Sequence, residues 1–121
     1  MSGCFLQDGS GLSARNGIPT KVFAQILRKM YLDTSSFPGF YDLLAIAGQT
    51  GTLKYFCKGS AADNNMRAKS GSLNRVRSFS GYLTNKSGRL LSFSVIVNNY
   101  KGKAYLMKKK LEKLLIALAE S

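Results

Sequence analysis

Two strand-like runs joined by a short turn constrain the fold of this chain more than any other sequence feature. Residues 75–84 alternate through Val76, Phe79 (one step out of phase) and Tyr82. Residues 90–98 are rich in apolar residues, namely Leu91, Phe93, Val95, Ile96 and Val97. Between the two runs, Asn85-Lys86-Ser87-Gly88 has the composition of a hairpin turn. A shorter strand over about 66–73 precedes them, so we predict a three-stranded antiparallel meander.

Helical patterns flank this meander on both sides. Val22, Ile26 and Met30 recur every four residues after Pro19, which predicts an amphipathic helix over about 19–31. A second, buried helix is expected from Phe40 to Ala47, ending at Gly48. The pattern of Lys101 to Glu120 predicts a last helix, with one apolar face formed by Leu111, Leu114, Leu115 and Leu118.

The resulting order of helix, helix, three strands and helix is an α+β layer arrangement. A length of 121 residues suits a single domain spanning the whole chain, 1–121. The N-terminus lacks the basic region and long apolar run of a signal peptide. No stretch approaches the roughly 18 apolar residues that a membrane-spanning helix needs.

Charge and the cysteine and histidine content narrow the function classes. Eighteen Lys and Arg face six Asp and Glu, giving a formal net charge of +12. The basic residues are dispersed apart from Lys108-Lys109-Lys110, as expected of solvated surface. The chain has no histidine, which excludes a Cys/His zinc site and a histidine-based triad. We expect no metal and no cofactor, and Cys4 and Cys57 could pair or remain free thiols.

One tripeptide, Lys69-Ser70-Gly71, resembles a catalytic motif and precedes a predicted strand edge. The motif set S-x-x-K, S-D-N and K-T-G marks β-lactamases and penicillin-binding proteins. In that chemistry the Lys attracts the substrate carboxylate and the hydroxyl hydrogen-bonds it. Alone, the tripeptide is a weak signal, because Lys86-Ser87-Gly88 repeats it in the hairpin turn.

Four further segments stand in a fixed order around this tripeptide. They are Asp8-Gly9-Ser10-Gly11-Leu12-Ser13, Ala47-Gly48-x-x-Gly51-Thr52-Leu53, Ser80-Gly81-Tyr82 and Phe93-Ser94-x-x-Val97-Asn98-Asn99. With Ala68-Lys69-Ser70-Gly71-Ser72-Leu73, the chain from about residue 8 to 118 resembles the C-terminal part of the D-alanyl-D-alanine carboxypeptidase/endopeptidase family of low-molecular-mass penicillin-binding proteins.

The resemblance implies a penicillin-binding transpeptidase-like (β-lactamase-like) fold, in which the K-T-G strand lines the active-site cleft. Lys69 and Ser70 would be catalytic and would bind the terminal carboxylate of a peptidoglycan D-Ala-D-Ala peptide or of a β-lactam. Gly71 would keep the backbone close to the acyl group, and the Ser72 N–H would donate to the oxyanion. Ser70 stands where the family usually has Thr, which keeps the hydroxyl. The segment 8–13 would shape a loop.

The nucleophile of that family is missing from this chain. No Ser is followed three positions later by Lys, and nucleophilic catalysis needs that Ser beside an activating base. Ser72-Leu73-Asn74 matches S-x-N by chance, because the family's S-x-N comes from another segment across the cleft. We therefore expect a C-terminal fragment of a periplasmic serine peptidase, natural or engineered, that alone neither hydrolyses D-Ala-D-Ala nor is acylated by penicillin.

Truncation also predicts an unpaired strand edge. In the full fold the strand at about 90–98 pairs with an N-terminal strand that this chain lacks, and exposed edges recruit other chains. We therefore expect a homodimer formed through strand pairing or swapping.

Two other functions compete with this interpretation. A basic module for nucleic acid would use the +12 charge with Tyr55, Phe56, Tyr100 and Tyr105, but the basic residues trace no single face. A membrane-surface anchor would use the last helix, whose apolar face is better explained by packing on the sheet. Both nucleic acid and membrane are therefore disfavoured as partners.

Overall fold

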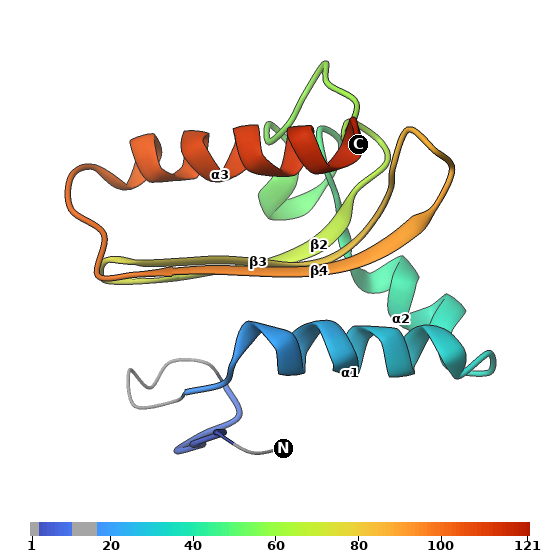
Figure 1. Cartoon of the computed structure of the whole chain (residues 1–121), viewed down its shortest axis with the longest axis horizontal. Coiled ribbons are helices and arrows are strands. Elements are labelled where there is room, and N and C mark those ends of the chain that lie inside the picture. The colour runs from blue at the N-terminus through green and yellow to red at the C-terminus, as the bar shows by residue number, and fades with distance from the viewer. Residues whose placement is uncertain (1–2, 11–16) are drawn as a thin grey trace.

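A computed structural model describes residues 3–10 and 17–121, and it forms a four-stranded antiparallel sheet between helical layers (Figure 1). The strands stand in chain order across the sheet: β1 (Ala45–Ile46), β2 (Arg67–Leu73), β3 (Val76–Thr84) and β4 (Leu90–Asn98). The helices are α1 (Thr20–Leu32), α2 (Phe37–Leu43) and α3 (Ala104–Ala119), with a 3-10 turn, η1 (Gly51–Leu53). The α+β class and the meander of β2, β3 and β4 are confirmed, and β1 adds a short fourth strand.

The β3–β4 hairpin follows from its turn residues. The Asn85 side-chain oxygen accepts a hydrogen bond from the Arg89 N–H at 2.9 Å, and the Asn85 N–H donates to the Arg89 carbonyl at the same distance. Gly88 has a φ of +81°, which favours glycine. This turn fixes the register that pairs Thr84 with Leu90 and every following residue.

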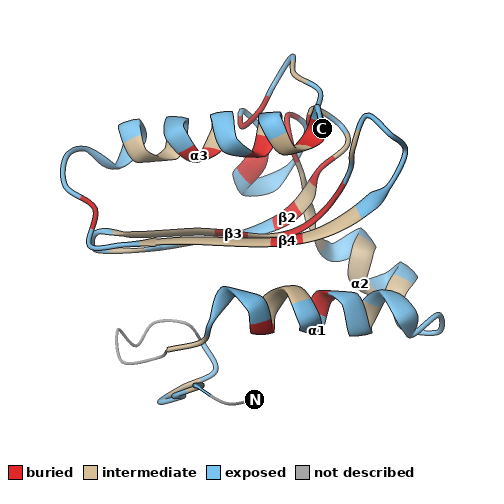
Figure 2. Cartoon of the chain, in the orientation of Figure 1, coloured by how far each residue is buried: buried red, intermediate tan, exposed pale blue. Residues whose placement is uncertain are grey.

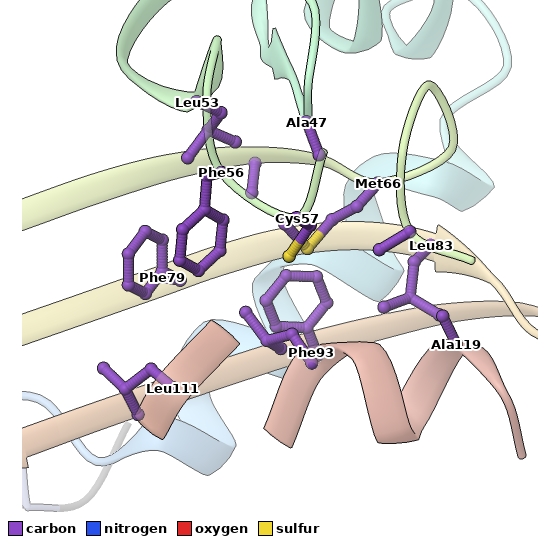
Figure 3. Packing of buried hydrophobic residues seen from close by; sticks show 13 residues of the cluster. Ala47, Leu53, Phe56, Cys57, Met66, Phe79, Leu83, Phe93, Leu111 and Ala119 are labelled. Carbon is purple, nitrogen blue, oxygen red and sulfur yellow. The ribbon is translucent and has the colours of Figure 1, made fainter. Parts of the chain in front are cut away.

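The larger part of the core lies between the sheet and α3. The Phe56 and Phe79 rings stack with centroids 4.5 Å apart, as their neighbouring positions in Figure 3 illustrate. On the opposite face, α1 lies over the sheet (Figure 1), and the buried Tyr82 hydroxyl donates to the Leu27 carbonyl at 2.6 Å. The buried cluster on the α3 side combines residues of β2, β3, β4 and α3 with residues of η1 and the connections, including Leu53, Ala68, Leu83, Phe93, Leu111 and Leu115.

The expected second helix, Phe40 to Ala47, is wrong in its bounds and its burial. The helix begins at Phe37, with Pro38 in its first turn where a missing N–H costs nothing, and it ends at Leu43. None of its residues is buried. The segment Ala45–Ile46 instead pairs with β2, so a strand partner distant in sequence overrides its local helical pattern.

The last helix has the expected location, and its expected apolar face is confirmed except at one residue. It begins at Ala104 rather than Lys101 and covers the sheet through Leu111, Leu115 and Ala119, which are spaced four apart. Leu114, expected on the apolar face, is 53% exposed. Both cysteines are free thiols, Cys57 buried and Cys4 partly buried. Among the described residues, no helix has the length and apolar character required to cross a bilayer.

Candidate functional site

The candidate site lies along the outer edge of β2. Strand β1 pairs with β2 only at Arg67 and Ala68, and no other strand of the described chain covers the edge from Lys69 onward. The Met66 carbonyl accepts the Ala47 N–H at 2.9 Å, on the β1 side. Because backbone groups of residues i and i+2 in a strand point to the same side, Ser70 and Ser72 direct their N–H and C=O groups outward along this open edge.

Lys69 presents its ammonium group at that edge. The side chain is exposed, and Nζ donates a hydrogen bond to the Ser70 carbonyl at 2.6 Å. Within residues 3–10 and 17–121, the only ion pair joins Arg67 to Asp42, at 3.5 Å. The charge of Lys69 is therefore not neutralised by a carboxylate of the described chain, and it can attract an anionic ligand group.

The Ser70 hydroxyl has a partner that the sequence did not reveal. Ser70, in β2, donates a hydrogen bond to the hydroxyl of Thr52, which lies 18 positions earlier in η1, at 2.9 Å. Thr52 is exposed and Ser70 is half-buried, so this polar pair is accessible to solvent. Thr52 belongs to the Gly51-Thr52-Leu53 segment noted in the sequence, but no local pattern indicated its contact with Ser70.

The turn that carries Thr52 is held by hydrogen bonds on both sides. The Thr50 hydroxyl accepts the Ile46 N–H at 2.9 Å, and the Gly48 N–H donates to the Leu53 carbonyl at 2.9 Å. A Cβ on Gly48 would overlap the Asp63 carboxylate, so glycine is required there. Hydrogen bonding lowers the pKa of Asp63, chiefly through the Gly59 N–H and then the Gln49 side chain. The charged carboxylate thus ties two loops together.

Gly71 lies opposite Ser78 of β3, and a Cβ there would lie 2.6 Å from the Ser78 hydroxyl oxygen. The glycine thus leaves room for Ser78 on one side while its strand edge stays open on the other. The second tripeptide, Lys86-Ser87-Gly88, sits in the β3–β4 turn, as the sequence indicated. Asn74 and Arg75 form the turn between β2 and β3, so Ser72-Leu73-Asn74 runs off the end of the same strand.

The segment 8–13 is described only in part. The Asp8 carboxylate accepts a hydrogen bond from the Ser10 hydroxyl at 2.9 Å, whereas residues 11–13 lie outside the described residues. Asp8 and Gly9 line a hollow of about 610 Å³ together with Leu73 and Val76, at the far end of β2. No group of acidic, Cys or His residues that could hold a metal occurs in the described part of the chain.

Comparisons with known proteins agree on one family. The model of the D-Ala-D-Ala carboxypeptidase 3 (S13) family matches residues 1–118. Carboxypeptidase DacB of Mycolicibacterium smegmatis is 38% identical over 103 residues, which are 81% of this chain and 22% of the relative. D-alanyl-D-alanine carboxypeptidase of Actinomadura sp. is 32% identical over 113 residues, which are 87% of this chain and 20% of the relative.

Solved structures show the same fold. Penicillin binding protein 4 (dacB) of Haemophilus influenzae superimposes with a TM-score of 0.80 and 26% identity, over 98% of this chain and 28% of that protein. Its complex with a β-lactam gives a TM-score of 0.84, with 25% identity over 98% of this chain and 29% of that protein. The chain thus spans about a fifth of the length of the curated relatives and under a third of these structures.

Proposed function

The chain belongs to the D-Ala-D-Ala carboxypeptidase 3 (S13) family, and on that premise we propose that it supplies the carboxylate-binding and oxyanion-binding edge of a serine-type D-Ala-D-Ala peptidase. The observation that supports this most directly is the open edge of β2 at Lys69, Ser70 and Ser72. The substrate would be the D-Ala-D-Ala end of a peptidoglycan stem peptide, and a β-lactam would occupy the same edge. No cofactor takes part.

In this proposal each residue of the edge has one role. Lys69 attracts the terminal carboxylate of the substrate through its unneutralised ammonium group. In the free chain the Ser70 hydroxyl donates its proton to Thr52 at 2.9 Å. When the substrate binds, this proton turns from Thr52 to the same carboxylate. The outward N–H of Ser72 donates to the oxygen that becomes negative when the acyl carbon is attacked. Gly71 keeps the strand free of a side chain beside that carbon.

The attacking group has to come from elsewhere, because this chain holds no S-x-x-K segment. We therefore propose that the isolated chain is neither acylated by penicillin nor able to cleave an acyl-D-Ala-D-Ala peptide. Intact-mass spectrometry after incubation with benzylpenicillin should show the unmodified chain. A covalent adduct on this chain would overturn the proposal, and mapping the adduct would identify the unexpected nucleophile.

A chimera tests the role of the edge itself. The equivalent C-terminal part of the Haemophilus influenzae protein would be replaced by this chain, and acylation by benzylpenicillin would be followed over time. Lys69→Ala should lower the acylation rate by about 100-fold, the size expected when a charged hydrogen-bonding partner is lost. Lys86→Ala, in the tripeptide of the hairpin turn, is the matched control and should leave the rate unchanged. Equal rates for the two variants would refute the assignment of Lys69.

The compartment and the assembly state are part of the same proposal. A peptidase of stem peptides works outside the cytoplasmic membrane, in the periplasm or cell wall.

β4 is the last strand of the described sheet, so its outer edge can accept a strand of a second copy. Light scattering at increasing concentration should give the mass of a dimer, and a constant monomeric mass would refute dimerisation.

A further inference from the structure

Five lysine side chains surround a hollow where the β4–α3 connection enters α3. The hollow has a volume of about 310 Å³, and Leu106 and Met107 form part of its wall. All five lysines are exposed (Figure 2 shows this end of α3 as mostly exposed). They are Lys101, Lys103, Lys109, Lys110 and Lys113.

This positive charge is not neutralised within the described chain. No ion pair among the described residues involves any of the five lysines. The first turn of α3 has no acidic residue, and its N-terminus has no side-chain cap, so its free N–H groups add to the positive potential. Glu112 is engaged elsewhere, since its carboxylate accepts the Cys57 N–H at 2.7 Å.

The run Lys108-Lys109-Lys110 is divided between two sides of the helix. Lys108 is half-buried, and its ammonium lies 5.7 Å from the centre of the Phe56 ring on the core side. Lys109 and Lys110 line the hollow. The basic residues, although dispersed in the sequence, thus include one spatial cluster, which forms when the β4–α3 connection folds next to α3.

Exposed apolar side chains adjoin these lysines. Tyr105 is 57% exposed and Leu106 is 47% exposed, one turn from the lysines of the hollow. α3 lies along the face of the sheet, and nothing of the described chain is drawn beyond the outer side of its N-terminal part, whereas a loop rises above its C-terminal end (Figure 1). Lysines beside an aromatic and an aliphatic residue on such a helix suit the boundary between lipid headgroups and acyl chains.

We propose that this surface, which lies away from the leucine face that packs on the sheet, docks on a bilayer containing anionic phospholipid. The lysines bind headgroup phosphates, and Tyr105 and Leu106 enter the interfacial layer. A nucleic acid fits less well, because successive bases need several stacking rings and Tyr105 is the only aromatic residue within 101–113. This surface uses none of the residues of the β2 edge, so the test of membrane binding does not depend on the proposed peptidase role.

The test is co-sedimentation of the full chain with vesicles of phosphatidylglycerol and phosphatidylcholine. We compare a triple variant of the hollow (Lys103→Gln, Lys109→Gln, Lys113→Gln) with a triple variant elsewhere (Lys21→Gln, Lys29→Gln, Lys86→Gln). Both variants remove three exposed lysines, so both change the net charge equally. The hollow variant should bind about 100-fold more weakly and the other less than about 5-fold, because only lysines near the surface contribute. Equal losses would mean that net charge alone drives binding and would overturn the proposal.

A second variant separates a bilayer from a soluble polyanion. Tyr105→Ser with Leu106→Ser keeps every lysine but should weaken vesicle binding by about 10-fold, since interfacial apolar burial is lost. If this double variant binds vesicles like the unmodified chain and an oligothymidine displaces both from vesicles, the surface is a general polyanion site and the proposal is wrong. Circular dichroism checks that each variant is folded.

Discussion

Replacing Gly81 by alanine tests whether the geometry of β2 depends on a close approach of β3. Gly81 stands directly opposite Ala68 in the sheet. A Cβ at Gly81 would overlap the Arg67 carbonyl oxygen and lie 2.6 Å from the Ala68 Cα. Both are backbone atoms of the strand that carries Lys69, so no side-chain rotation can relieve the overlap.

The penalty follows from the immobility of those neighbours. Overpacking a buried site costs about 1–3 kcal/mol, and a clash with strand backbone lies at the upper end of that range. We take about 3 kcal/mol for Gly81→Ala. With a urea m-value of about 1.5 kcal/mol per molar for a small domain, the unfolding midpoint should fall by about 2 M.

The assay is urea unfolding followed by circular dichroism, with Gly39→Ala as the matched control. Gly39 lies in α2 with nothing within 4 Å of an added Cβ, so the substitution adds the same methyl group without a clash. Alanine favours a helix over glycine by up to about 1 kcal/mol, so the midpoint of this control should stay or rise.

Two results would refute this reasoning. Equal midpoints for Gly81→Ala and the unmodified chain would mean that the two strands separate freely, and that the position of Lys69 does not depend on Gly81. An equal fall for Gly39→Ala would mean that an added methyl group destabilises the chain even without a backbone overlap, and that the loss at Gly81 has another cause. Faster amide exchange along β2 in the Gly81 variant alone would locate the damage at the candidate site.

Three further changes have defined outcomes. Tyr82→Phe should lower the free energy of unfolding by about 1–2 kcal/mol in urea titrations, because it removes the 2.6 Å hydrogen bond to the Leu27 carbonyl; no loss would mean that the hydroxyl does not anchor α1. The pKa of the Cys57 thiol is raised to about 12, chiefly by burial and then by the charges of Glu112 and Asp63. Iodoacetamide at pH 8 should therefore label Cys4 and spare Cys57 in the native chain. Labelling of both thiols would contradict the burial of Cys57. Because the pKa of Asp63 is lowered in the folded chain, its contribution to the free energy of unfolding is present above the ordinary carboxyl value of 3.8 and lost as pH falls below it. Asp63→Asn should therefore flatten the dependence of stability on pH in that range. An unchanged pH dependence would refute the role of its hydrogen bonds.

The sheet was predictable because its signals are local. Alternating apolar residues and the Asn85–Gly88 turn set the β3–β4 hairpin within a single stretch of sequence. The second helix was not, because its C-terminal residues Ala45 and Ile46 pair with a strand more than twenty positions later. Leu114 was misplaced for a related reason: the contacts of α3 with the sheet select Leu111 and Leu115, and leucine alone does not reveal which face is covered.

The candidate site was predictable only as far as its motif. Lys69 and Ser70 were found from the order of several segments, and the structure puts them on an open edge. The Ser70–Thr52 hydrogen bond could not be foreseen, since a hydroxyl in a glycine-rich turn gives no sign of its partner. The lysine hollow was equally hidden, because its members come from a connection and from one side of a helix.

The strand order of the sheet has a consequence for folding kinetics. β2, β3 and β4 follow one another in the chain with short turns between them, and short loops close quickly, whereas a longer connection separates β1 from β2. The contacts of α1 span 55 positions to Tyr82 and 68 positions to Ser92, so they form at a greater entropic cost. We therefore expect the meander to assemble first and α1 to dock later. A destabilising change in the hairpin turn would slow folding, whereas one under α1 would mainly speed unfolding.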